Sequence, residues 1–135
     1  MTAFAGEPTA LTTILVVEDV ARAKAWYLDV LGAELYGEYG GTSVVVSFLG
    51  AWLLLVTGGG PTDDKPTVTF AAPSDHDRVH HAFTIRVGDC TMAYQALLER
   101  GARFLTPPVE HGSETRAFFR DPDGHLFEIS AVRRG

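Results

Sequence analysis

The chain carries the same order of secondary-structure elements twice, and this duplication limits the folds that it can adopt. Residues 11–17 (LTTILVV) are a β-branched run typical of a strand, residues 82–89 (AFTIRVGD) are a second expected strand, and each leads through an aspartate into an amphipathic helical segment. Aligned positions include Val17 with Val87, Asp19 with Asp89, Ala23 with Ala93, and Leu28 with Leu98. The period of about 70 residues is too long for a solenoid repeat, so it predicts two paired modules.

Each half is expected to contain a strand, a helix and then three strands. Asp19 is a candidate helix cap and Gly32 a helix stop, because aspartate accepts hydrogen bonds from a first turn and glycine adopts left-handed backbone. The remaining expected elements are strands at 34–38, 42–49, 52–57, 102–106, 115–121 and 125–132, a second helix at 90–100, and a candidate edge strand at 67–70. This order predicts one α+β domain, with module one at about 11–57, a linker at about 58–79, and module two at about 80–132.

Composition and charge restrict the classes of partner. The 17 acidic and 11 basic residues give a net charge of −6, without a run of Lys or Arg, which argues against nucleic acid and anionic membranes. Apolar runs such as 52–56 are too short to span a bilayer, and residues 1–10 lack the pattern of a signal peptide. The single cysteine, Cys90, excludes an internal disulfide and suits a reducing compartment. We therefore expect a soluble cytoplasmic protein.

Two motifs connect the chain with a known family. They are "VEDVARAKAWYLDVLGAEL" (17–35) and "FFRDPDGHLFEIS" (118–130). With the duplication, they make residues 11–132 resemble the vicinal oxygen chelate superfamily, which contains glyoxalase, bleomycin-resistance and extradiol-dioxygenase proteins. The resemblance implies two βαβββ modules that form a cup-shaped mixed β-sheet, with one helix per module packed outside, in a homodimer. It does not name an activity, because the same scaffold serves lyases, dioxygenases, epimerases, thiol transferases and drug-binding proteins.

The resemblance also implies where a metal ion would bind. Metal-dependent members place His, Glu or Gln on the first strand and Glu or His on the last strand of each module. The matching positions in this sequence are Thr12, Leu54, Ala82 and Glu128. Because one carboxylate cannot fix a transition metal, we expect no metal cofactor. The alternative is a divalent ion (Fe, Mn, Ni, Zn or Mg) held by Glu128 with His80 or His111.

Strand alternation then divides the side chains into two faces. Counting from the four reference positions, we expect these residues to face the cup: Thr12, Ile14, Val16, Trp52, Leu54, Val56, Ala82, Thr84, Arg86, Leu126, Glu128 and Ser130. The opposite set is wholly apolar and is expected to pack on the helices: Leu15, Val17, Leu53, Leu55, Phe83, Ile85, Val87, Phe127 and Ile129. The cup is therefore apolar in module one and polar in module two.

Glu128 has two interpretations without a metal. A carboxylate on an inner face needs a partner, so it either forms a structural ion pair with Arg86 or Arg116 or contacts a ligand. Trp52 is likewise either a ligand contact or a dimer contact. Asp121 and Asp123 belong to a turn and are expected to be structural, as Trp26 and Tyr27 are expected to be core residues and Cys90 an inert thiol.

The leading hypothesis is a metal-independent protein that binds a hydrophobic or partly anionic small compound in its cup. The candidate ligand-binding residues are Thr12, Trp52, Leu54, Ala82, Thr84, Arg86, Arg116 and Glu128. One alternative is a metal-dependent glyoxalase-like lyase or dioxygenase. The other is a metal-free enzyme in which Glu128 is the catalytic general base and Arg86 stabilises an oxyanion.

Overall fold

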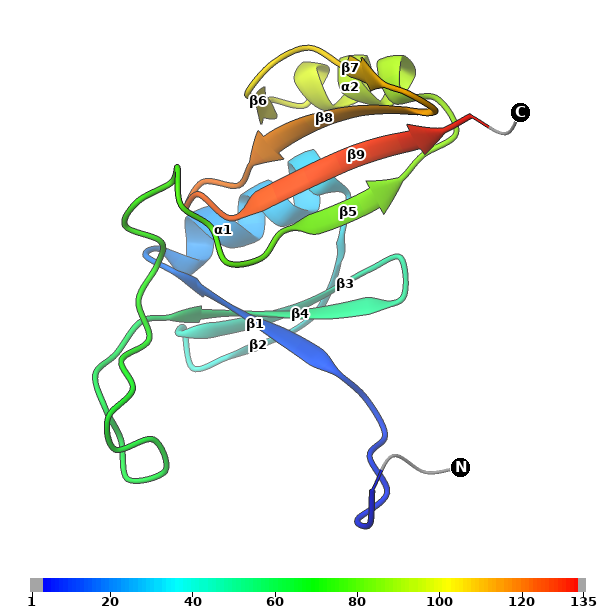
Figure 1. Ribbon diagram of the computed structural model, residues 1–135. Coiled ribbons are helices and arrows are strands. Elements are labelled where there is room, and N and C mark those ends of the chain that lie inside the picture. Colours follow the sequence, from blue (N-terminus) through cyan, green and yellow to red (C-terminus); the bar gives the residue numbers. More distant parts are fainter. Residues whose placement is uncertain (1–3, 134–135) are drawn as a thin grey trace.

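The computed structural model describes residues 4–133 and contains two βαβββ modules (Figure 1). The elements of the first module are β1 (Thr12–Val17), α1 (Val20–Trp26), the π-helical turn η1 (Tyr27–Leu31), β2 (Glu34–Tyr39), β3 (Ser43–Phe48) and β4 (Ala51–Thr57). They form a four-stranded sheet of order β1-β4-β3-β2, in which β1 runs parallel to β4 and the other pairs are antiparallel.

The second module repeats this plan. Its elements are β5 (Phe83–Arg86), α2 (Cys90–Glu99), β6 (Arg103–Phe104), β7 (Val109–His111), β8 (Glu114–Arg120) and β9 (Leu126–Val132). The first strand, β5, again runs parallel to the last, β9, in a sheet of order β5-β9-β8-β6, and β7 pairs with β8 as an addition that the sequence did not predict. The predicted α+β fold is confirmed, with the strands divided between two mixed sheets.

The helices begin and end where the sequence indicates. The Asp19 carboxylate accepts hydrogen bonds from the N–H groups of Ala21 and Arg22 at the start of α1, and Asp89 accepts from Met92 N–H at the start of α2. These contacts satisfy backbone donors that the first helical turn leaves free. Gly32 ends the first helical segment with a φ of 85°, a conformation that glycine adopts without a steric penalty.

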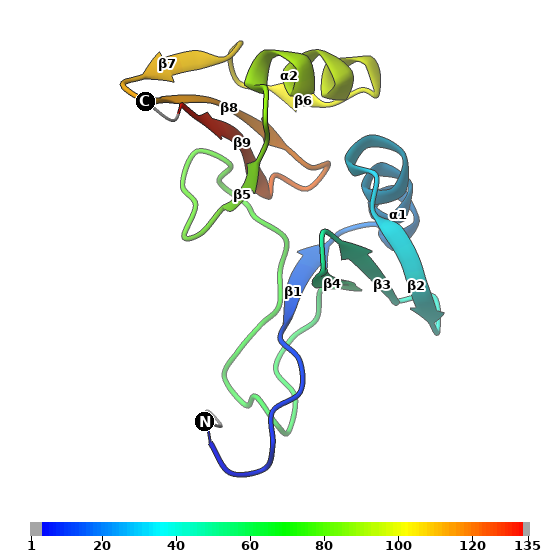
Figure 2. The same ribbon diagram turned by 90° about the vertical axis from the view of Figure 1, so that its right-hand side faces the viewer.

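One hydrophobic core joins the two modules. The predicted helix-facing residues lie in this core or pack against it, so the predicted alternation is confirmed. Trp26 of α1 packs against the second module. The centroid of its ring lies 6.2 Å from that of Phe119 and 5.8 Å from that of Phe127. Figure 2 shows α1 above the first sheet and beside the second, whereas α2 covers the second sheet. The two modules therefore pack together through their helix-facing sides.

The opposite sides of the sheets are called their inner faces below. Strand registers place Thr12, Ile14, Trp52 and Leu54 on the inner face of the first sheet, and Thr84, Arg86, Arg116, Phe118, Glu128 and Ser130 on that of the second. Among the described residues, no strand of one sheet pairs with a strand of the other, so β1 and β5 are both edge strands. An edge strand leaves backbone N–H and C=O groups available to another strand.

The turn between β8 and β9 fastens the second module to the first. Tyr27 O–H donates to Asp121 Oδ2 over 2.6 Å, and His125 Nε2–H donates to the carbonyl oxygen of Val16 over 2.8 Å. Asp123 Oδ1 accepts from the backbone N–H of Glu18 at 2.9 Å and from Arg22 at 3.1 Å. The predicted structural role of Asp121 and Asp123 is thus confirmed, because both carboxylates connect the second module to the first.

The segment between β4 and β5 is a long loop. Its pairing consists of two isolated bridges, Gly59 with Phe70 and Thr62 with Lys65. Residues 67–70, the candidate edge strand, therefore contribute a single bridge residue rather than a strand. Neither helix in residues 4–133 combines the length and apolar character required to span a membrane.

Candidate functional site

Glu128 occupies the centre of the inner face of the second sheet. It lies on β9 between Thr84 of β5 and Phe118 of β8, and its side chain is buried, with 9% of the residue exposed. Thr84 Oγ1–H donates a hydrogen bond of 2.8 Å to Glu128 Oε1. This contact follows from the parallel register of β5 and β9, which sets the two residues side by side.

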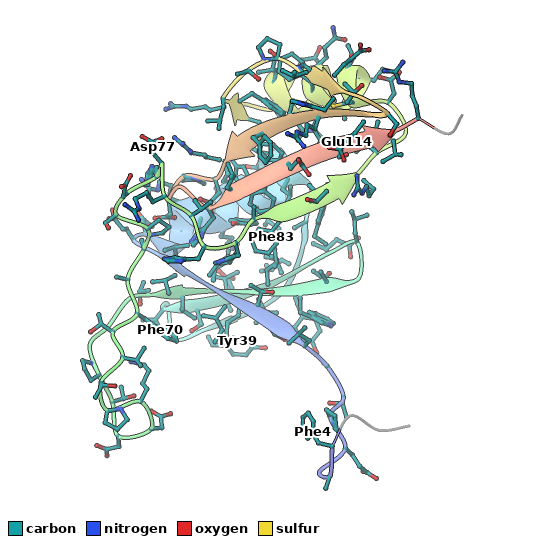
Figure 3. The ribbon with its side chains drawn as sticks, viewed as in Figure 1. Phe4, Tyr39, Phe70, Asp77, Phe83 and Glu114 are labelled. Carbon is teal, nitrogen blue, oxygen red and sulfur yellow. The ribbon has the colours of Figure 1, made fainter. Side chains whose placement is uncertain are left out.

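The ion pair considered for Glu128 is not observed. Arg86 and Arg116 instead both pair with Glu114 on β8, at 3.2 Å each. Arg86 also donates to Ser130 Oγ over 2.6 Å. Hydrogen bonds from Ser130, Arg86 and Arg116 hold the pKa of Glu114 below its usual range. Figure 3 labels Glu114 near the carboxyl end of β9, beyond the centre of the strand where Glu128 lies.

This arrangement leaves Glu128 without a cation among residues 4–133. The hydrogen bond from Thr84 engages one carboxylate oxygen, and no hydrogen bond within the described part of the chain engages the other. Such an oxygen can accept a hydrogen bond or a proton from a bound molecule. The arginines beside it retain further N–H donors, because each guanidinium carries five.

The inner face of the first sheet is apolar. Thr12 lies beside Trp52 and Ile14 beside Leu54, and Ile14 is 47% exposed. The Trp52 ring packs edge-to-face on Tyr36 with centroids 4.8 Å apart. The sequence did not identify Tyr36, because an irregularity in the β2–β3 register between residues 35 and 37 obscures which face it occupies.

The predicted site residues fall into two groups, one on each sheet. Thr12, Trp52 and Leu54 form the first group, and Thr84, Arg86, Arg116 and Glu128 form the second, with Ala82 immediately before β5. A cavity of about 470 Å³ lies near these groups but is lined by none of them. Its walls come from Ile14, Val16 and Leu126, together with Gly124, His125 and loop residues 71–75 and 78–81. The sequence missed this loop contribution, because a turn-rich segment carries no periodicity that fixes its path.

The side chains present do not fit the metal site of metal-dependent relatives. Across residues 4–133, no three His, Cys, Asp or Glu side chains are grouped so that they could hold a metal ion. His111 lies opposite Glu114, four residues along β8 from the partner of Glu128, or about 13 Å at the usual strand rise. His80 lines the cavity described above, of which Glu128 is not part. The structure therefore brings neither histidine to Glu128.

The family follows from comparison with known proteins. The model of the Glyoxalase/Bleomycin resistance protein/Dioxygenase superfamily matches residues 9–129. The chain belongs to this superfamily. The match includes both inner faces and the turn that connects the modules, so the superfamily's duplicated scaffold accounts for the repeat seen in the sequence.

Proteins similar to this chain include both an enzyme and a binding protein. Biphenyl-2,3-diol 1,2-dioxygenase 3 of Rhodococcus globerulus is 30% identical over an alignment of 124 residues that covers 86% of this chain. The match spans 59% of that relative's length. A superfamily protein from Nocardioides has a TM-score of 0.74 at 22% identity and covers 98% of this chain and 89% of its own. TnmS3, an antibiotic binding protein from Streptomyces sp. CB03234, has a TM-score of 0.67 at 20% identity, covering 96% and 99%.

Proposed function

We propose that this protein binds a small hydrophobic or partly anionic compound between its inner faces, without a metal ion. The observation that carries the proposal is the state of Glu128, which is buried on the inner face and hydrogen-bonded by Thr84 rather than paired with a cation. The other three positions where metal-dependent relatives place ligands hold Thr12, Leu54 and Ala82, of which none is an ordinary metal ligand.

The two inner faces suit different parts of one ligand. Trp52, Leu54 and Ile14 offer an aromatic and aliphatic surface, as in most small-molecule sites. Arg86 and Arg116 offer guanidinium donors, and Arg86 is accessible because 63% of its side chain is exposed. An anionic group near these arginines and an apolar body against Trp52 would satisfy both faces. Similarity in fold to an antibiotic binding protein supports this class of ligand.

A second copy of the chain completes the binding site in this proposal. Within one chain the sheets share no strand pair, and β1 and β5 are both edge strands. A second copy that pairs these edges would place an apolar inner face opposite a polar one. We therefore propose a homodimer. The single cysteine, Cys90, is buried and unpaired, which suits the reducing cytoplasm that we propose as its location.

Metal content separates this proposal from a metal-dependent lyase or dioxygenase. Protein purified without chelators and analysed for Fe, Mn, Ni, Zn and Mg should contain fewer than about 0.1 ions per chain, because one carboxylate does not hold such an ion. One metal ion per chain that is lost in Glu128→Ala would reject the proposal.

Ligand binding is tested with 8-anilino-1-naphthalenesulfonate, a planar apolar anion whose fluorescence rises in apolar sites. Trp52→Ala and Arg86→Gln should each weaken its binding about tenfold, because one removes the aromatic surface and the other a charged donor. Arg133→Gln is the matched control, since Arg133 is an exposed arginine at the end of β9. Equal affinity in all four proteins would place the probe elsewhere and contradict the proposed site.

A further inference from the structure

A second cavity, of about 540 Å³, lies where α1 meets the β6–β8 end of the second sheet. None of the residues assigned to the inner-face site lines it. Its walls include Arg22 and Trp26 of α1, Arg103 and Phe104 of β6, Arg120 of β8, and His76 of the long loop. The cavity therefore combines three guanidinium groups with aromatic surface, and nothing in the proposed function uses it.

Arg103 and Arg120 face each other directly across the β6–β8 pair. Like charges at opposed positions of neighbouring strands destabilise a sheet. The ion pairs found among residues 4–133 do not include Arg103, so its charge is not neutralised by the described part of the chain. An anion between the two guanidinium groups would convert this repulsion into attraction.

Arg120 also has an unused donor. Its Nη2 donates to the His76 carbonyl oxygen at 3.1 Å and to Asp77 at 3.2 Å, and Asp77 is labelled at the tip of the loop in Figure 3. Its Nε is buried and has no hydrogen-bond partner among the described residues. A buried donor without an acceptor is unfavourable, so the hydrogen-bonding capacity of Arg120 is incompletely used within the described residues.

The carboxylates around the cavity are engaged elsewhere. Asp121 lines the wall, but Tyr27 donates to one of its oxygens, and the backbone N–H groups of Asp123 and His125 donate to the other. Asp123 accepts from Arg22, whose side chain remains 49% exposed. The Asp77 side chain is 90% exposed, where water weakens its attraction for Arg120. The cavity lining therefore contains three arginines and one carboxylate, Asp121, and the pairs of Arg22 with Asp123 and of Arg120 with Asp77 leave Arg103 as the lining arginine without an ion pair among the described residues.

The remaining surface is apolar. Trp26 and Phe104 contribute aromatic rings, and Leu105 and Pro122 contribute aliphatic groups. Trp26 is half-buried and packs against the core on one side, so its ring is held in place. A ligand that fills this cavity thus needs a flat or aliphatic body as well as a charge.

We propose that this cavity is a separate binding site for a small organic oxyanion, a carboxylate or phosphate ester on an apolar body. Arg103 and Arg120 bind the oxyanion as two planar donors, and Trp26 with Phe104 packs on the apolar body. The site uses none of the residues assigned to the inner-face site.

Isothermal titration calorimetry with phenyl phosphate, benzoate and benzyl alcohol tests the proposal. We expect the anions to bind and the neutral alcohol not to bind. Tighter binding of phenyl phosphate would assign the site to phosphate esters, and tighter binding of benzoate would assign it to carboxylates. Arg103→Gln should weaken binding about tenfold, because each charge-assisted hydrogen bond contributes strongly to affinity. Arg103→Lys, which keeps the charge but lacks the planar fork, should be intermediate.

Arg133→Gln removes the same charge from an exposed site at the far end of β9 and should leave the affinity unchanged. Because Arg103 is exposed, its variants are expected to fold, and an unchanged urea midpoint verifies this. Absence of anion binding, equal binding of benzyl alcohol, or equal losses in the Arg103 and Arg133 variants would overturn the proposal. Binding that is lost in Arg86→Gln but kept in Arg103→Gln would move the anion to the inner face and overturn it too.

Discussion

At the scale of the residue, two carboxylates on the inner face of the second sheet differ in their ion-pair and hydrogen-bond partners. Glu114 takes both arginines and Ser130, whereas Glu128 keeps a single hydrogen bond from Thr84. A buried carboxylate without a cation is unfavourable for folding. In the proposed site, Glu128 would favour binding at the expense of stability, whereas Glu114 holds the two arginines in place.

Substitution at the two carboxylates should affect stability differently. Glu128→Gln keeps an acceptor for Thr84 and removes an unpaired charge, so the free energy of unfolding should fall by less than about 1 kcal/mol or rise. Glu114→Gln should lower stability at neutral pH. Because the folded pKa of Glu114 lies below its ordinary 4.5, its contribution is present above that value and is lost as the pH falls through the folded pKa.

Urea unfolding at pH 7 and at pH values below 4.5 measures both effects. The deficit of Glu114→Gln should shrink in acid, because protonation of Glu114 removes its ion pairs with the arginines. A large loss of stability in Glu128→Gln at neutral pH would mean that a cation outside the described residues neutralises this carboxylate, and would contradict the assignment.

At the scale of the element, the turn from Asp121 to His125 has two functions. It reverses the chain between β8 and β9, and it binds the start of α1 and the end of β1 in the other module. These contacts connect residues 94 to 109 positions apart in the sequence. The turn therefore fixes how the modules sit on each other, and with them the cavity walls that Arg22 and Arg120 share.

Tyr27→Phe tests this connection. Phenylalanine lacks the hydroxyl with which the buried Tyr27 donates a hydrogen bond to Asp121. We therefore expect the free energy of unfolding to fall by about 1.5–3 kcal/mol. Burial, followed by the charge of Asp121, raises the pKa of Tyr27 well above 10.0. The unfolded chain therefore loses this proton first, and the stability of the native protein should decline as the pH rises above 10.0.

Tyr27→Phe should lack that alkaline decline, which urea unfolding at neutral and alkaline pH would detect. Tyr94→Phe is the control, because Tyr94 packs on Phe104 in the same core and its hydroxyl has no hydrogen bond among the described residues. Equal alkaline slopes in wild-type protein and Tyr27→Phe would show that another group causes the decline.

Local pattern explains which elements could be predicted. Alternation assigned Phe127 to the core and Glu128 to the inner face, because one-residue steps along a strand change the face. Long-range choices could not be predicted in this way. The sequence does not show that Glu114 would take both arginines, that β7 would add to β8, or that His76 would pass beside Gly124. These three contacts depend on how segments distant in the sequence meet in space, which the spacing of residues along the chain does not determine.

At the scale of the whole molecule, two similar modules pack through their helix-facing sides, and no strand of one sheet pairs with a strand of the other among the described residues. Figure 2 shows the second sheet above the first, with α1 between their levels. The edge strands β1 and β5 are free within residues 4–133. This arrangement completes the core within one chain and leaves one side of β1 and of β5 available for pairing with another strand.

Multi-angle light scattering should give a mass of twice 14.6 kDa at micromolar concentration. Ile14→Asp places a charge on the exposed inner side of β1 and should shift the mass toward that of one chain. Leu98→Asp is the matched control, since Leu98 is 42% exposed on α2, close to the 47% of Ile14. A wild-type mass of one chain, or equal dissociation in the two variants, would contradict the homodimer.

The free edges of β1 and β5 have a consequence for ligand affinity. If two chains are needed to bring an apolar face opposite a polar one, ligand binding and chain association are linked, and each strengthens the other. Apparent affinity at the inner faces then rises with protein concentration, and dilution releases the ligand together with the partner. The anion cavity is built from one chain, so its occupancy has no such dependence. The protein would thus bind the inner-face ligand only at high protein concentration, and the anion in the cavity at any protein concentration.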